Sequence, residues 1–313
     1  MARPAKIHAT GGDTATGRGR ALFFGLLVLL LLAVLALGYA WGVISHAKQL
    51  FPYNHLKELF AAAPVQSLGL YSGYDVTLGR EELACRELPA DSLVLVLFGQ
   101  SNAGNSGAGR FGAVEGVYNY NHLDGRCYRA RDPLLGATGN GGTPWLPLAQ
   151  AIIRHSLSEA VVLAPIAVGQ TRVAQWAPGG NLHGRIGRVL DGLRAAGLPV
   201  GKLLWHQGES DGATSTREYE EAFLRMAASI RDAGEAAPIH VAVATRCQGE
   251  PNPAVRRAQQ RLPMLMPGLR AGPDTDGLAG PRWRVGCHFT QEGLRRHADL
   301  WFSALYPMET GQR

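Results

Sequence analysis

The stretch of sequence that decides the fold is SLVLVLFGQSNAG, residues 92–104. Its first seven residues are almost all apolar, which is the pattern of a strand buried on both faces of a parallel sheet. The chain then turns polar and presents Gln100, Ser101 and Asn102 directly after Gly99. Ligand sites of α/β proteins lie beyond the carboxyl ends of such strands, so we expect a functional site at this turn.

The same pattern recurs along the chain after residue 104. Further apolar runs alternate with segments that have a helical apolar period, and the last of these begins at Thr290, a good helix-capping residue. Alternating strands and helices predict a parallel sheet with helices on both faces. The predicted strands span 92–98, 160–168, 200–205, 239–245 and 269–272, and the predicted helices span 144–157, 182–196, 216–233, 252–262 and 290–305.

Polar residues also follow the later strands. Gly169 follows the second strand, WHQGESD (205–211) ends the third, and GCHFT (286–290) precedes the last helix. A serine hydroxyl becomes a useful nucleophile only with a base in hydrogen-bond reach. Catalysis of acyl transfer also needs donors that face the developing oxyanion. The Ser, Gly, Gln, Glu and His side chains at this rim could supply these groups.

Three of these blocks, GQSN (99–102), WHQGESD and GCHFT, resemble in order the signature blocks of the SGNH (GDSL-like) hydrolase superfamily. Within that superfamily they are similar to the sialate O-acetylesterase, carbohydrate esterase family 6, branch. The resemblance covers residues 90–306. It implies an α/β fold of the flavodoxin-like type, a three-layer α/β/α sandwich with a five-stranded parallel sheet. It also implies a carboxylic ester hydrolase that removes O-acetyl groups, often from sugars.

The resemblance assigns roles to individual residues. Ser101 corresponds to the nucleophile and His288 to the general base. The backbone N–H groups of Ser101 and Gly169 correspond to oxyanion donors, and we expect the Gln207 amide to be the third donor. A carboxylate at Glu209 would repel an oxyanion, so we expect Glu209 to orient His288 or to bind neighbouring amides.

The sequence departs from the family at one position. The family usually carries Asp three residues before the catalytic histidine, and this chain carries Val285 there. Three replacements stay open: Glu209, Asp276 or Asp274, or a backbone carbonyl that holds the imidazole of a Ser–His dyad. Loss of the acid affects control of the imidazole tautomer, whereas the nucleophile and the oxyanion donors are kept.

The N-terminal segment indicates export. Residues 21–44 carry no charge, and 24 helical residues span about 36 Å, which exceeds a hydrocarbon core of ~30 Å. Four basic residues and one acid precede this run, which predicts a cytoplasmic N-terminus. We expect an uncleaved signal anchor with the catalytic domain in the periplasm or another extracytoplasmic space. A cleaved signal peptide is the alternative.

The four cysteines all follow the apolar run, where disulfides are plausible. The sequence does not choose between the three possible pairings. We favour Cys85–Cys127 and Cys247–Cys287, and four free thiols are the alternative. No metal-binding motif is present, so we expect neither metal nor cofactor.

The charge balance bears on the partners. The net charge of +6 falls to +3 when residues 1–20 are set aside, which does not indicate a nucleic-acid partner. The expected partners are an acetylated glycan or other small ester, and the membrane through residues 21–44. An O-acetyltransferase and a silent glycan-binding protein of the same fold are the alternative functions. The predicted organisation is a cytoplasmic stub at 1–20, an anchor at 21–44, a connector at 45–90 and the esterase domain at 91–313.

Overall fold

The computed structural model describes residues 14–48 and 73–307 of the chain. The chain divides into two compact units, Met1–Ala63 and Pro64–Arg313. Part of the predicted connector, residues 49–72, lies outside the described part.

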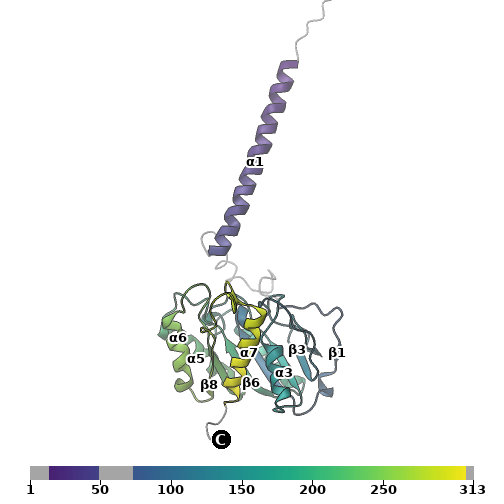
Figure 1. Ribbon diagram of the computed structural model, residues 1–313, viewed down its shortest axis with the longest axis vertical. Helices are drawn as coiled ribbons and strands as arrows, with labels where there is room; N and C mark the ends of the chain where they lie inside the picture. The colour runs from purple at the N-terminus through teal and green to yellow at the C-terminus, as the bar shows by residue number, and fades with distance from the viewer. Residues whose placement is uncertain (1–13, 49–72, 308–313) are drawn as a thin grey trace, which may run out of the picture. The chain divides into compact units, whose positions relative to one another are not determined.

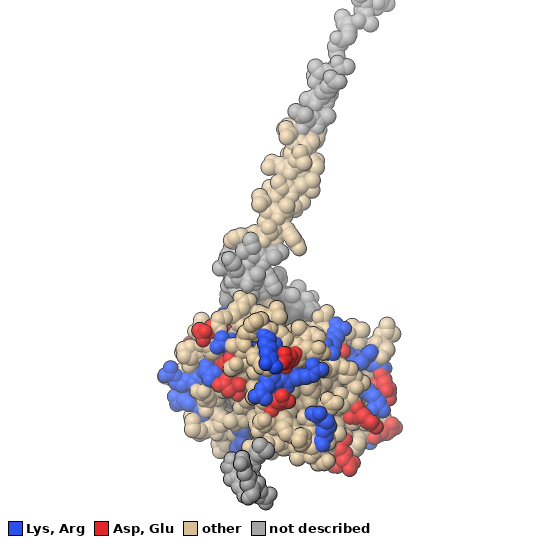
Figure 2. Space-filling view, viewed as in Figure 1, with Lys and Arg blue, Asp and Glu red and all other residues tan. Residues whose placement is uncertain are grey.

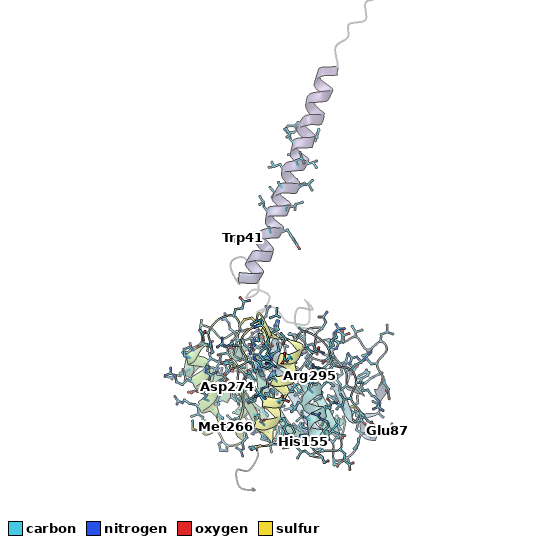
Figure 3. The ribbon with its side chains drawn as sticks, in the orientation of Figure 1. Trp41, Glu87, His155, Met266, Asp274 and Arg295 are labelled. Carbon is cyan, nitrogen blue, oxygen red and sulfur yellow. A yellow bond between two sulfur atoms is a disulfide. The ribbon has the colours of Figure 1, made fainter. Side chains whose placement is uncertain are left out.

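The first unit contains one long helix, α1 (Thr14–Lys48). Its segment Phe23–Gly42 has 20 residues, is apolar enough to cross a membrane, and is not buried inside the protein. Apolar side chains and Trp41 project from the helix into open space (Figure 3). At 1.5 Å per residue this segment matches the ~30 Å of a hydrocarbon core. The predicted apolar helix is therefore confirmed, and both a membrane span and a signal sequence fit it.

The second unit is an α/β fold around one large sheet (Figure 1). Its strands are β1 (Glu82–Leu83), β2 (Leu93–Gly99), β3 (Val117–Asn121), β4 (Arg126–Arg129), β5 (Val161–Pro165), β6 (Val200–His206), β7 (Ile239–Val243) and β8 (Leu269–Asp274). A separate hairpin consists of β9 (Arg284–Val285) and β10 (His288–Phe289). The helices are α3 (Trp145–Arg154), α4 (His183–Ala195), α5 (Thr216–Asp232), α6 (Pro253–Leu265) and α7 (Gln291–Leu305), with short 3-10 turns η2 (Cys85–Glu87), η3 (Ser101–Ala103) and η4 (Val173–Gln175).

The strand order is β1-β4-β3-β5-β2-β6-β7-β8. All neighbours from β3 to β8 in this order are parallel, whereas β4 and β1 add an antiparallel edge. The prediction of five strands is therefore wrong, because the sheet has eight. The missed strands β1, β3 and β4 are short or polar: β3 reads VYNYN and β4 reads RCYR, so neither shows an apolar run.

Alternating side chains of β2 point to the two faces of the sheet, as the strand period requires. Leu95 and Leu97 belong to a core cluster with residues of α3 and α7. Phe98 instead meets Trp205 on β6, which in turn contacts Phe223 of α5. Helices therefore cover both faces of the sheet, with α3 and α7 packed together on one and α5 on the other.

The helix starts follow their capping residues. Thr290 accepts a hydrogen bond from the Gly293 N–H at 2.9 Å, as its position in the sequence predicts. Ser215 and Glu218 form a reciprocal capping box at the start of α5. Such caps satisfy backbone N–H groups that have no partner in the first turn. The cap at Thr290 fixes the start of α7 directly after His288 and Phe289.

Both favoured disulfides are present, Cys85–Cys127 and Cys247–Cys287. The first joins η2 to β4 at the antiparallel edge of the sheet. The second joins the loop after β7 to the turn between β9 and β10. Since His288 follows Cys287 directly, the second disulfide ties the predicted base to the main sheet.

Candidate active site

The site lies at the topological switch point of the sheet, where the order in which strands are added changes direction. The first long strand, β2, stands between β5 and β6, and later strands are added on either side of it. Ligands of α/β proteins bind at such a switch point, outside the carboxyl ends of the strands. The structure places Ser101 there, as the first residue of η3 after β2.

Gly99 lets β2 end close to its neighbour. Its φ is +124°, and a Cβ at this position would overlap the carbonyl oxygen of His206 at the end of β6. The Gln100 N–H also donates to that carbonyl oxygen, at 3.0 Å. A side chain at residue 99 would push apart the two loops that carry Ser101 and Gln207.

Gly169 lies beside Ser101. A Cβ built on Gly169 would stand 3.6 Å from the Ser101 Cβ, so the two backbones are neighbours. In this structure the Gly169 N–H donates to the Thr138 hydroxyl at 2.8 Å. No motif in the sequence points to Thr138, which lies in the segment between β4 and α3.

Gln207 lies beneath the site and is completely buried. Its Nε2 donates to the Thr171 carbonyl at 2.8 Å and to the Asp211 carboxylate, and its Oε1 accepts from the Tyr219 hydroxyl at 3.0 Å. Both the nitrogen and the oxygen of the amide are already hydrogen-bonded to other residues. These contacts therefore do not favour Gln207 as the third oxyanion donor. They favour a role in holding the loop after β6.

Glu209 is brought to the site by the same loop, and its side chain is only 2% exposed. Its Oε1 accepts a hydrogen bond from the Asn102 Nδ2 at 2.8 Å. Burial raises the pKa of Glu209 to about 7, although Asn102 and Arg284 act in the opposite direction. Within the described residues its Oε2 has no hydrogen-bond partner.

His288 lies on β10, which packs against η3 and therefore against the turn that carries Ser101. The ring makes no hydrogen bond to another described residue, so the Ser101–His288 bond is not formed in this structure. Catalytic hydrogen bonds are often loose until substrate binds. Burial, and then Arg284, lower the pKa of His288, which keeps the imidazole neutral and able to accept a proton.

The carboxylates that could replace the missing acid have other partners in this structure. Val285 is paired with His288 across the β9–β10 hairpin and is 69% exposed. Asp274 and Asp276 both form ion pairs with Arg256, at 2.6 Å and 2.8 Å. Among the described residues, no carboxylate is hydrogen-bonded to the His288 ring.

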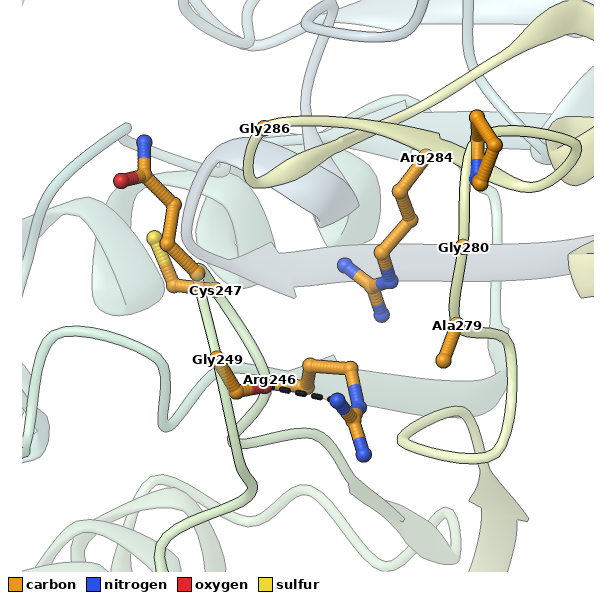
Figure 4. A pocket seen from close by; sticks show the side chains of 9 residues that line it. Arg246, Cys247, Gly249, Ala279, Gly280, Arg284 and Gly286 are labelled. Atoms are coloured by element: carbon orange, nitrogen blue, oxygen red, sulfur yellow. Dashed lines mark hydrogen bonds between the residues drawn. The ribbon is translucent and has the colours of Figure 1, made fainter.

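A cavity of about 290 Å³ adjoins the hairpin. It lies between the loop that contains Arg246 and Cys247 and the segment that runs from Ala279 to Gly286. Figure 4 shows the side chains of Arg246 and Arg284 extending into this space. Neither Ser101 nor His288 lines this cavity, so we assign it no role in the chemistry.

The structure offers no metal-binding cluster in the parts that it describes, residues 14–48 and 73–307. A serine, an imidazole and neighbouring backbone N–H groups at a switch point are groups that serine ester hydrolases use. The chain is a carboxylic ester hydrolase.

The comparisons with known proteins agree. Residues 91–300 match the family model of the carbohydrate esterases described as sialic acid-specific acetylesterases. The chain belongs to this family, as its three sequence blocks indicated. A search of curated proteins found no match.

Similar solved structures were found, and the one from Arabidopsis thaliana shares the fold. A protein from Arabidopsis thaliana, solved at 1.6 Å resolution, is 21% identical, with a TM-score of 0.57 over 69% of this chain and 96% of its own. NanS is 15% identical, with a TM-score of 0.49 over 69% and 97%. A carbohydrate acetylesterase from Xanthomonas citri is 15% identical, with a TM-score of 0.46 over 67% and 55%.

Proposed function

We propose that the protein is a membrane-anchored, extracytoplasmic serine esterase that hydrolyses O-acetyl esters on a sugar or polysaccharide. The observation that carries the proposal is the meeting of three separate sequence blocks at one switch point. Asn102, next to Ser101, donates one hydrogen bond to Glu209 and another to the Cys287 carbonyl, next to His288.

In this proposal His288 removes the proton of the Ser101 hydroxyl, and the Ser101 oxygen attacks the acetyl carbonyl carbon. The backbone N–H groups of Ser101 and Gly169 stabilise the oxyanion, which requires the Gly169 N–H to turn from Thr138 to the substrate. Protonated His288 then gives its proton to the leaving sugar oxygen. His288 then removes a proton from a water molecule, which attacks the carbonyl carbon of the acetyl-enzyme. The bond to the Ser101 oxygen breaks, acetate leaves, and His288 returns the proton to Ser101.

The direct test is the hydrolysis of p-nitrophenyl acetate and of an O-acetylated sugar by the full chain in detergent. Ser101→Ala is expected to reduce kcat/KM at least 1,000-fold, the scale seen when a serine nucleophile is removed. Ser210→Ala is a matched control, because Ser210 lies on the neighbouring loop and has no assigned role. Unchanged activity of Ser101→Ala would contradict the proposal.

The charge distribution is compatible with a sugar substrate. Blue and red side chains are interspersed on the face seen in Figure 2, without one large field of a single sign. Continuous basic stripes are the electrostatic footprint of nucleic-acid binding.

A further inference from the structure

Asn102 joins the three sequence blocks of the site. Its side chain is buried, and its Nδ2 donates to two acceptors, Glu209 Oε1 at 2.8 Å and the Cys287 carbonyl oxygen at 2.9 Å. These acceptors lie 107 and 185 residues further along the chain. One side chain therefore connects the nucleophile turn, the loop after β6 and the hairpin that carries His288.

The Cys287 carbonyl is held from two sides. Asn102 donates to it from the nucleophile turn, and the Arg284 Nη1 donates to it from β9 at 2.8 Å. Because the carbonyl of Cys287 and the nitrogen of His288 belong to one planar peptide unit, fixing this oxygen restricts the backbone at His288. The contact thus acts on the position of the proposed base.

An asparagine suits this position better than an aspartate. The two groups that it joins, a carboxylate oxygen and a carbonyl oxygen, are both acceptors, so only a donor can lie between them. The amide N of Asn supplies two N–H groups, whereas the oxygens of Asp would place a third acceptor against both. The hydrogen bond to Glu209 is also charge-assisted when that carboxylate is ionised.

The arrangement keeps unsatisfied polar atoms in the interior. The Oδ1 of Asn102, the Oε2 of Glu209 and the Nδ1 of His206 are buried, and none of them has a hydrogen-bond partner among the described residues. Buried atoms of this kind are costly and rare, and they often mark functional sites. Stability of the fold alone does not account for a charged residue at this junction.

We propose that Asn102 is a positioning residue that links Glu209 to the backbone at His288, and that this link replaces the direct contact between a carboxylate and the imidazole. The inference rests on the proposed roles of Ser101 and His288 and deepens them. In this arrangement Glu209 orients Asn102, Asn102 fixes the Cys287 carbonyl, and the hairpin presents the His288 ring to Ser101.

The test compares four variants of the full chain in detergent. Asn102→Ala and Asn102→Asp remove the bridge, and both are expected to lower kcat about 100-fold with little change in KM, the scale of a small misplacement of a catalytic group. Glu209→Ala removes the carboxylate that accepts the hydrogen bond of Asn102, and it is expected to lower kcat by a similar factor. Glu209→Gln keeps an oxygen acceptor for Asn102, so its kcat is expected to stay within about threefold of the wild type.

A double-mutant cycle measures the coupling between Asn102 and Glu209 directly. If the two residues act as one unit, Asn102→Ala combined with Glu209→Ala is expected to lose about as much as either single variant, far less than the product of the two losses. The rate at which an organophosphonate labels Ser101 is expected to fall by the same factor as kcat. A purely structural role would lower thermal stability without this shared, non-additive loss.

Asn119→Ala is the matched control. Asn119 is also a buried asparagine that donates to backbone carbonyls, but it lies on β3 and bonds to Leu135 and Leu163. Its replacement is expected to reduce stability and leave kcat of the folded protein unchanged.

Two results would overturn the inference: wild-type kcat in Asn102→Ala, or a Glu209→Gln variant as impaired as Glu209→Ala. If either occurs while Ser101→Ala is inactive, the positioning role fails and the proposed esterase function stands. Full activity of Ser101→Ala would instead remove the proposed function itself.

Discussion

His288 is the residue whose ionisation is expected to control the rate. Burial and Arg284 lower its pKa below its ordinary value of 6.5, and a general base works only when it is unprotonated. We therefore expect the decrease of kcat/KM in acid to have its midpoint below pH 6.5. A pH–rate profile with p-nitrophenyl acetate measures this midpoint, and a value above pH 6.5 would contradict the prediction.

Glu209 affects stability through its raised pKa of about 7, compared with an ordinary value of 4.5. Between these values the unfolded chain loses the proton before the folded chain does, so stability is lost as the pH rises toward 7. Glu209→Gln does not titrate. We consider the difference in free energy of unfolding, that of Glu209→Gln minus that of the wild type. This difference is expected to rise by about 3 kcal/mol from pH 4.5 to pH 8, because only the wild type loses stability over this range.

Urea unfolding in detergent at the two pH values measures this difference, with Glu221→Gln as the exposed control. A difference that is the same at pH 4.5 and pH 8 would show that the pKa of Glu209 is not raised in the folded protein.

The residues of the site were predictable to different degrees. Ser101 and Gly169 follow strands with clear apolar runs, so their meeting at one rim could be expected from the sequence. Of the two roles expected for Glu209, the structure has the hydrogen bond to a neighbouring amide, that of Asn102, and no hydrogen bond joins Glu209 to the His288 ring among the described residues. Side-chain hydrogen bonds of this kind depend on distances between distant loops, which no local pattern specifies.

At the scale of elements, the Cys247–Cys287 disulfide joins the β9–β10 hairpin to the main sheet. It and Cys85–Cys127 close loops of similar length, with separations of 40 and 42 residues. Removing either pair is expected to cost about 4 kcal/mol of stability by the loop-closure estimate. Only removal of Cys247–Cys287 is expected to lower kcat, because only this disulfide holds the backbone next to His288.

The measurement compares the two double serine variants, Cys247→Ser with Cys287→Ser and Cys85→Ser with Cys127→Ser, at a temperature where both are folded. Equal losses of kcat in the two variants would show that the hairpin is positioned without its disulfide.

The elements also show what a single sequence can reveal. The buried parallel strands and the helix after Thr290 were predictable, because apolar runs and a capping residue are local signals. Strand β3 was not, because Asn119 and Asn121 are buried polar residues that interrupt its apolar pattern. Their hydrogen bonds to distant backbone groups, such as Asn119 to Leu163, compensate for burial only in the folded protein.

At the scale of the whole molecule, the apolar helix and the disulfides suggest a domain held on the oxidising side of a membrane. If α1 is an uncleaved anchor, the chain is expected to stay in the membrane pellet after an alkaline carbonate wash and to keep residues 1–20 by intact-mass analysis. Protease added from outside is expected to reach the catalytic domain. A released chain that lacks the apolar segment would identify α1 as a cleaved signal sequence.

The proposed chemistry requires Ser101 to be a nucleophile that His288 activates. Mass spectrometry of the full chain, after reaction with an organophosphonate that labels activated serines, tests this requirement. One adduct is expected, located on Ser101, that forms in the wild type and in Glu209→Gln and is nearly lost in His288→Ala. A folded wild-type protein that gains no adduct, or an adduct on another residue with Ser101 unmodified, would contradict it.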